Sequence, residues 1–113
     1  MADCLFCKII AGDIPAEKVY EDAEFLGFKD IAPKAPVHIL VIPKKHIASL
    51  EELQEEDALL MGRLQLVLQK IARDQGLAGS GYRIINNCGR DAGQVVFHLH
   101  YHLLGGSSGL NLD

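Results

Sequence analysis

Three histidines near the end of the chain alternate with single apolar residues. They are His98, His100 and His102, and two leucines follow them. Side chains of a β-strand point to opposite faces in turn. The run 97–104 is therefore predicted to be a strand with three imidazoles on one face and apolar side chains on the other. Adjacent imidazoles pack poorly, but each can act as nucleophile, proton carrier, metal ligand or phosphate donor near neutral pH.

The composition limits the possible partners. A length of 113 residues with 49 % hydrophobic residues predicts one folded domain over 1–113 with its own core. The net charge of −4 provides no global basic field for nucleic acid or an anionic membrane, so an anionic ligand must be held by local donors. No apolar run has transmembrane length, and no signal-peptide pattern is visible. We predict a cytoplasmic protein with no nucleic-acid or membrane partner.

The apolar periodicity predicts an α+β fold with an antiparallel sheet, because strands dominate and no regular βαβ alternation occurs. Asp3 is the expected cap of the first helix and Gly12 its end. A capping-box sequence at 49–52 and Gly76 are expected to bound the long helix. The tail 105–113 is expected to be loose. The predicted elements are helices at 4–11 and 53–75 and strands at 18–20, 25–28, 37–42, 82–86 and 97–104.

A polar, glycine-rich loop at 87–94 leads directly into the histidine run. Gly93 allows the backbone to approach a ligand closely, and bare backbone N–H groups in such turns bind anions. Most loops of this composition are only turns. Because three histidines follow it, this loop is predicted to form the second wall of a phosphate site.

The cysteines permit three interpretations: a zinc site, a redox pair or no function. Cys4 and Cys7 form a C-x-x-C motif, whereas Cys88 has no partner at a useful spacing and is taken as incidental. An odd number of cysteines does not suit a disulfide framework. Zinc needs two further ligands, which His46 and one histidine of the run could supply if the first helix lies beside the sheet.

Two further residues have an ordinary interpretation beside a functional one. His38 lies within an apolar strand, where a lone histidine is most often a satisfied structural residue. Asp30 follows a predicted strand, where a carboxylate could accept two hydrogen bonds from a ribose diol, although a plain turn aspartate is the commoner case.

The run 98–104 matches the histidine triad signature His-φ-His-φ-His-φ-φ, where φ is apolar. Over 3–106 the chain resembles the Hint branch of the histidine triad (HIT) family, the purine nucleoside phosphoramidases. The resemblance implies a five-stranded antiparallel meander with one long helix and one short amino-terminal helix. It also implies a homodimer in which the two sheets become continuous. The supporting stretches are 6–10, 14–15, 28–31, 40–46 and 93–94.

The resemblance implies hydrolysis of the P–N bond in purine nucleoside phosphoramidates, such as AMP-amine conjugates, through a covalent nucleotidyl-histidine and with no metal in the chemistry. It assigns His100 as nucleophile, with His102 and His38 beside the phosphate. The implied nucleotide-binding residues are Asn87, Gly93 and Gln94 for the phosphate, Asp30 for the ribose, and Phe6, Ile14, Phe28, Ile31 and Leu40 for the base.

The resemblance also implies a structural zinc ion, with Cys4, Cys7, His46 and His98 as its ligands.

Two features depart from the pattern of the animal relatives. Val95 stands where they carry a serine that can donate a hydrogen bond, and the tail after 106 diverges from theirs. Both departures bear on which leaving group is accepted.

Three alternatives stay open. A dinucleoside polyphosphate hydrolase of the same superfamily would share the nucleophile. A nucleotidylyltransferase is less favoured, because that branch carries His-Pro-His and Leu99 stands in the middle position here. A non-catalytic zinc- or nucleotide-binding module is the least favoured, because all five histidines fall on predicted functional positions.

Overall fold

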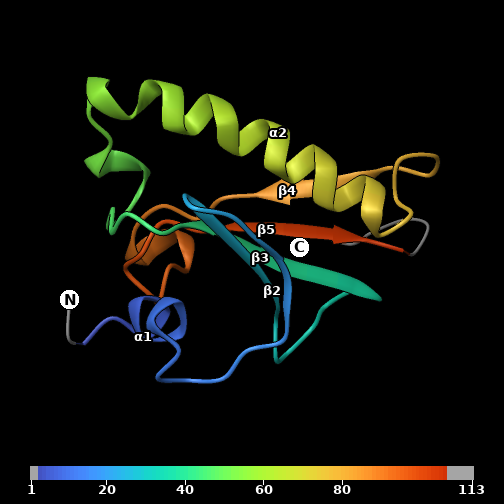
Figure 1. Cartoon of the computed structure of the whole chain (residues 1–113), viewed down its shortest axis with the longest axis horizontal. Helices are drawn as coiled ribbons and strands as arrows, with labels where there is room; N and C mark the ends of the chain where they lie inside the picture. Colours follow the sequence, from blue (N-terminus) through green and yellow to red (C-terminus); the bar gives the residue numbers. More distant parts are fainter. Residues whose placement is uncertain (1–2, 107–113) are drawn as a thin grey trace.

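The computed structural model describes residues 3–106. Its five strands are all antiparallel and form one sheet, with the long helix on one face and the short helix on the other (Figure 1). The predicted α+β fold class is confirmed. The elements are α1 (Leu5–Ala11), β1 (Lys18–Glu21), β2 (Phe25–Lys29), β3 (Val37–Pro43), 3-10 turns η1 (Leu50–Glu52) and η2 (Glu55–Asp57), α2 (Ala58–Asp74), β4 (Tyr82–Ile85), 3-10 turn η3 (Arg90–Ala92) and β5 (Tyr101–Gly105).

The strand order is β1-β2-β3-β5-β4, so a simple meander is wrong for the last two strands. The chain leaves β3, crosses the sheet through α2 and enters β4 at the far edge, and β5 returns between them. This order places the end of the histidine run beside β3. His38 of β3 pairs with Leu104, and Leu40 pairs with His102. The topology thus brings together two histidines that are far apart in the sequence.

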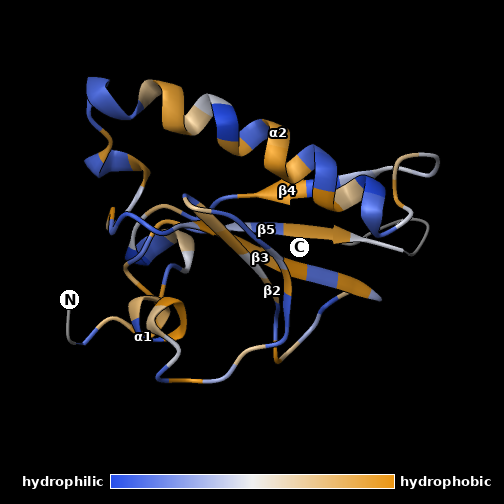
Figure 2. Cartoon of the chain, in the orientation of Figure 1, coloured by the Kyte–Doolittle hydropathy of each residue, from blue (hydrophilic) through white to orange (hydrophobic). Residues whose placement is uncertain are grey.

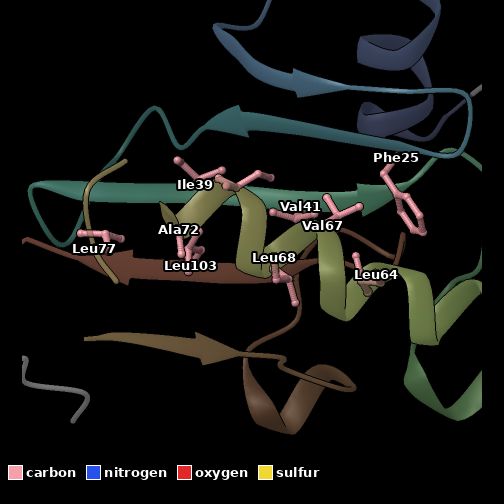
Figure 3. Close-up of a cluster of buried hydrophobic side chains, with 10 residues drawn as sticks. Phe25, Ile39, Val41, Leu64, Val67, Leu68, Ala72, Leu77 and Leu103 are labelled. Carbon is pink, nitrogen blue, oxygen red and sulfur yellow. The ribbon is translucent and has the colours of Figure 1, made fainter. Parts of the chain in front are cut away.

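The two faces of the sheet bury separate apolar clusters. Along β3, Ile39 and Val41 face α2, whereas Leu40 and Ile42 belong to the cluster under α1. Hydrophobic and hydrophilic residues alternate along α2 (Figure 2), and its residues Leu64, Val67 and Ile71 are buried. Figure 3 shows the cluster under α2, which consists of Phe25, Ile39, Val41, Leu64, Val67, Leu68, Ile71, Ala72, Leu77 and Leu103.

The long helix is shorter at its start than predicted. It begins at Ala58 rather than Leu53, because η1 and η2 occupy the preceding residues. Ser49 makes no capping hydrogen bond, and the capping box lies instead between Gln54 and Asp57. The Gln54 N–H donates to the Asp57 carboxylate at 2.9 Å, which fixes the 3-10 turn. At the other end, Gly76 has the left-handed conformation expected just after a helix.

The short helix begins one residue later than predicted, and its cap differs. Cys4 is the N-cap, and its Sγ accepts a hydrogen bond from the Cys7 N–H at 3.3 Å. Asp3 is therefore not the cap, whereas Gly12 ends the helix in the left-handed conformation as predicted. Neither helix in residues 3–106 combines the length and the apolar composition that crossing a bilayer requires.

The predicted loose tail starts too early. Gly105 is the last residue of β5 and is buried, while 107–113 lie outside the described residues. Gly105 faces Leu77, which is 3 % exposed. A Cβ at this position would lie 2.7 and 2.8 Å from the two methyl carbons of Leu77. This close approach explains why the strand ends in a glycine.

We expect Gly105→Ala to lower the free energy of unfolding by about 1–3 kcal/mol, because the added methyl overpacks a closed core. Urea denaturation measures this change. Gly79→Ala is the matched control, because a Cβ there has no atom within 4 Å, and its effect should stay within about 0.5 kcal/mol. Equal stability of the two variants would contradict the packing argument.

Candidate functional site

Three histidines meet on the α1 face of the sheet. His38 lies in β3, His102 lies in β5, and His100 directly precedes β5. The ring centroids of His38 and His102 are 5.2 Å apart, as are those of His100 and His102. The three rings face a cavity of about 400 Å³. The other residues lining this cavity are Asp30, Ala32, Lys34, Ile85, Asn87, Gly93, Val95 and Leu104.

The predicted strand over 97–104 is wrong for its first four residues, because β5 begins at Tyr101. The preceding segment is held by hydrogen bonds outside the strand ladder. The Leu99 N–H donates to the Ile47 carbonyl at 2.6 Å, and the Gln94 side chain donates to the Ala48 carbonyl at 2.9 Å. The alternation of the side chains is nevertheless retained, so the predicted grouping of the imidazoles is confirmed.

His100 is oriented by its neighbours. Its Nδ1 lies 2.7 Å from the His98 carbonyl oxygen, which can only accept, so Nδ1 carries the proton. Nε2 therefore keeps its lone pair, as a nucleophile requires. The Phe6 ring meets the imidazole edge-on at 5.1 Å, and the Asn86 side chain donates to the His100 carbonyl at 2.9 Å. The ring is thus held in one tautomer beside the cavity.

His38 and His102 form a hydrogen-bonded chain. The Lys34 N–H donates to Nδ1 of His38 at 3.1 Å, so neutral His38 carries its proton on Nε2. This atom lies 2.9 Å from Nδ1 of His102 and 3.4 Å from a carboxylate oxygen of Asp30. Because Nδ1 of His102 accepts, its own proton is on Nε2, where it can be donated to a bound group. The two residues are 64 positions apart, and only the family resemblance had grouped them, as neighbours of the phosphate.

Both rings are neutral near pH 7. Burial and the neighbouring His100 and His38 lower the pKa of His102 to about 4. Burial also lowers the pKa of His38, against the opposing effect of the Asp30 carboxylate. Neutral rings keep the donor and acceptor directions of the chain fixed.

The low pKa of His102 makes the stability depend on pH. The ordinary value of 6.5 applies to the unfolded chain, so between pH 6.5 and 4 the unfolded chain binds more protons than the folded one. The stabilisation is complete above pH 6.5 and is lost as the pH falls toward 4. We expect His102 to contribute about 2–3 kcal/mol to this loss, measured by urea denaturation. His102→Gln should show a smaller loss over the same window, and an unchanged loss would contradict the assignment.

Asp30, His38 and His102 also place their ligand atoms within 4.8 Å of one another, close enough for a metal ion. The hydrogen bonds favour a different interpretation. Nδ1 of His38 already accepts the Lys34 N–H, so Nε2 carries a hydrogen and offers no lone pair to an ion. This group therefore fits a proton-bearing chain better than a metal centre.

A second group joins α1 to the sheet. Cys4, Cys7, His46 and His98 also place their ligand atoms within 4.8 Å of one another. Three sulfur–nitrogen distances are short: 3.3 Å for Cys4 to His98, 3.3 Å for Cys7 to His46, and 3.6 Å for Cys7 to His98. Ligands of a tetrahedral zinc ion are about 3.6 Å apart when the bonds have their usual lengths. The spacing thus fits a closed tetrahedral site.

The protonation of His98 also fits a metal ligand. Its Nε2 lies 2.8 Å from the Pro43 carbonyl oxygen, so Nε2 donates and Nδ1 faces the cysteines with a lone pair. Burial lowers the pKa of His98, which keeps the ring neutral. Burial, together with a hydrogen bond to Cys4, raises the pKa of the Cys7 thiol, so metal binding there would release a proton. Cys4 and Cys7 are free thiols and form no disulfide with each other.

The predicted nucleotide residues fall into two sets. Asp30, Asn87 and Gly93 line the cavity, as expected. Gln94 is buried, and its side chain accepts the Gly89 N–H at 2.8 Å, so it braces the loop instead of lining the cavity. The cavity is not lined by the predicted base-pocket residues. Ile31 is fully exposed, Ile14 is partly buried, and Phe6, Phe28 and Leu40 are buried in the cluster under α1.

The sequence and the fold match known proteins. Residues 3–111 match the family described as "Scavenger mRNA decapping enzyme C-term binding". An uncharacterized HIT-like protein from Synechococcus elongatus is 54 % identical over 106 residues, which cover 94 % of this chain and 92 % of that protein. The chain therefore belongs to the histidine triad (HIT) family.

Two solved structures show the same fold. A HIT family hydrolase from Legionella pneumophila is 46 % identical with a TM-score of 0.92, and the match covers 94 % of this chain and 95 % of that one. A histidine triad protein from Clostridium difficile is 48 % identical with a TM-score of 0.94 and coverage of 100 % and 98 %. The resemblance drawn from the histidine run is thus confirmed for the family.

Proposed function

We propose that the protein is a hydrolase that cleaves the P–N bond of purine nucleoside 5′-phosphoramidates, such as AMP-amine conjugates, through a nucleotidyl-His100 intermediate. One observation carries the proposal. His100 donates Nδ1–H to the His98 carbonyl at 2.7 Å, which leaves Nε2 unprotonated beside the cavity. The family and the similar Legionella hydrolase agree with a nucleotide ligand and with hydrolysis.

In the first step, Nε2 of His100 attacks the α-phosphorus and forms a P–N bond, while the bond to the amine breaks and the amine leaves with the electron pair of that bond and takes a proton from solvent. In the second step, water attacks the same phosphorus, breaks the bond to His100 and releases the nucleoside monophosphate. Nε2–H of His102 is the proposed donor to a phosphoryl oxygen, where charge develops. Gly93 also lines the cavity, where its backbone is proposed to contact the phosphate.

Asp30 is the proposed partner of the ribose. One of its carboxylate oxygens accepts the Ala32 N–H at 2.8 Å, and the other lies 3.4 Å from Nε2 of His38. Each oxygen has a second lone pair, so the carboxylate can still accept from two hydroxyls. Ile31, which follows Asp30 in the sequence and is fully exposed, is the proposed contact of the base.

Two assembly features accompany this proposal. Cys4, Cys7, His46 and His98 are proposed to hold one zinc ion that stabilises the fold and takes no part in the reaction. A homodimer is supported by the edge strand β4, which exposes Tyr82 and Ile84 and could pair with a second copy. A cytoplasmic location without nucleic-acid or membrane partners stays a prediction from the composition.

The proposal is tested by comparing turnover of AMP-tryptamine and diadenosine tetraphosphate with EDTA present. We expect the phosphoramidate to be cleaved at least about tenfold faster. Its leaving group is a single amine that carries no charge in the conjugate, whereas the polyphosphate brings several negative charges into the site. The reverse preference would favour the polyphosphate hydrolase. Nucleotide binding without cleavage of either compound would favour the binding module.

A further inference from the structure

The histidine cavity contains one permanently charged cation. Among the described residues that line it, Lys34 is the only lysine or arginine, and Asp30 is the only acid. His38 and His102 are neutral near pH 7, so they offer hydrogen bonds but no positive charge. His100 acts as a nucleophile only when its ring is neutral. A phosphoryl group in this cavity therefore depends on Lys34 for a counter-charge.

The loop 30–36 between β2 and β3 fixes the backbone of Lys34 at the cavity. The Lys34 N–H donates to Nδ1 of His38 at 3.1 Å, and the Ala32 N–H donates to the Asp30 carboxylate at 2.8 Å. Where the loop begins, the Asp30 N–H donates to the His38 carbonyl at 3.0 Å. The Lys34 side chain therefore starts beside the His38 ring and is long enough to reach a group bound there.

Within residues 3–106, the Lys34 ammonium forms no ion pair with a carboxylate. The ion pairs of this part of the chain engage other cations, among them Lys29, which lies 2.7 Å from Glu17. The Asp30 carboxylate faces His38 instead, with one oxygen 3.4 Å from Nε2 of that ring. Lys34 is exposed and lines the cavity, so its charge can meet a ligand without the loss of an existing pair.

The positive charge of Lys34 acts on the two histidines beside the proposed phosphate position. Burial is the largest cause of the lowered pKa of His38 and of His102, and the charge of Lys34 contributes to both. His102 is the proposed donor to a phosphoryl oxygen. A cation close enough to act on this ring is also close enough to attract a phosphoryl group bound to it.

We propose that Lys34 is a specificity residue that pairs with the phosphoryl group of the bound nucleotide and so selects nucleotides over uncharged nucleosides. This inference rests on the proposed phosphoramidase function, because it concerns the phosphate of the same substrate. The phosphoryl group is negatively charged in the substrate, in the transition state and in the product. Lys34 therefore strengthens the binding of all three, and its loss should raise KM with little change in kcat.

The test compares the binding of AMP with that of adenosine, which has the same base and ribose but no phosphoryl group. Lys34→Gln should weaken AMP binding about three- to tenfold at low salt and change adenosine binding by about twofold or less, both followed by NMR titration. The variant keeps the backbone N–H that donates to His38, so the loop retains its hydrogen bond to that ring. The difference between the variant and the wild type should shrink at high salt.

Two further variants separate a local charge from other effects. Lys34→Arg keeps the charge and should bind AMP within about twofold of the wild type. Lys70→Gln removes the same charge from α2, where the side chain is 61 % exposed and 3.6 Å from Asp74. It should bind both ligands as the wild type does, which controls for the change in net charge.

Turnover of AMP-tryptamine distinguishes this inference from the proposed function. Lys34→Gln should raise KM about as much as it weakens AMP binding and should keep kcat within about twofold of the wild type. Unchanged AMP binding, or equal weakening of AMP and adenosine, would overturn the role of Lys34 while leaving the phosphoramidase intact. If AMP binding depends on Lys34 but the wild type cleaves no conjugate, the charge assignment is supported and the phosphoramidase function is wrong.

Discussion

His100→Ala is expected to reduce kcat for an AMP-amine conjugate by at least about a thousandfold. The substitution removes the only ring whose unprotonated Nε2 is available beside the cavity, since Nε2 of His38 and His102 carries the proton in the hydrogen-bonded chain. Amine release measured with EDTA present gives the rate. Glu51→Gln, at an exposed position in η1, is the control and should retain the wild-type rate.

His102→Gln provides a graded comparison. It removes a proposed donor to the phosphoryl oxygen but leaves the nucleophile, so we expect a smaller loss of about ten- to a hundredfold. If His100→Ala kept a rate within tenfold of the wild type, the nucleotidyl-histidine mechanism would be wrong. The site would then act through activated water or only bind nucleotide.

Loss of the proposed zinc ion from the Cys/His group is expected to produce the largest change in stability. We expect the purified protein to contain about one zinc ion per chain by elemental analysis, and Cys7→Ser to contain far less. The melting temperature of Cys7→Ser should fall by on the order of 10 °C, because the four ligands tie α1 to the sheet and the loop before β5. Cys88→Ser is the control and should keep both the zinc and the melting temperature.

The same change should also lower activity. The carbonyl of His98 holds the His100 ring at 2.7 Å, and the His98 ring belongs to the Cys/His group. Without the proposed zinc ion, the His98 ring would be held less firmly, and the orientation of His100 would loosen with it. A metal-free wild type with unchanged melting temperature and unchanged rate would show that the four residues do not form a structural zinc site.

The sequence was most informative where a local pattern fixes the arrangement of side chains. The period of two at His98, His100 and His102 predicted three grouped imidazoles, and this grouping persists although two of them precede β5. The C-x-x-C motif indicated a possible zinc site with His46 and one histidine of the run, and the family resemblance identified that histidine as His98. Both inferences depend on residue type and order, which tertiary packing alters little.

The parts that could not be predicted depend on contacts between distant segments. The bond from His38 to His102 follows from the insertion of β5 beside β3, which no local pattern reports. The support of the segment before β5 depends on Gln94, which was expected to contact phosphate but is buried against the Ala48 carbonyl. Asn86, whose side chain holds the His100 carbonyl, gave no sequence signal at all.

The most direct measurement is rapid-quench intact-protein mass spectrometry during turnover of an AMP-amine conjugate. The proposed mechanism predicts a transient mass gain of one adenylyl group, mapped by peptide analysis to His100 and lost as AMP appears. The adduct should be absent in His100→Ala and present in Glu51→Gln. Turnover with no adduct at any quench time, or an adduct on another residue, would contradict nucleophilic catalysis by His100.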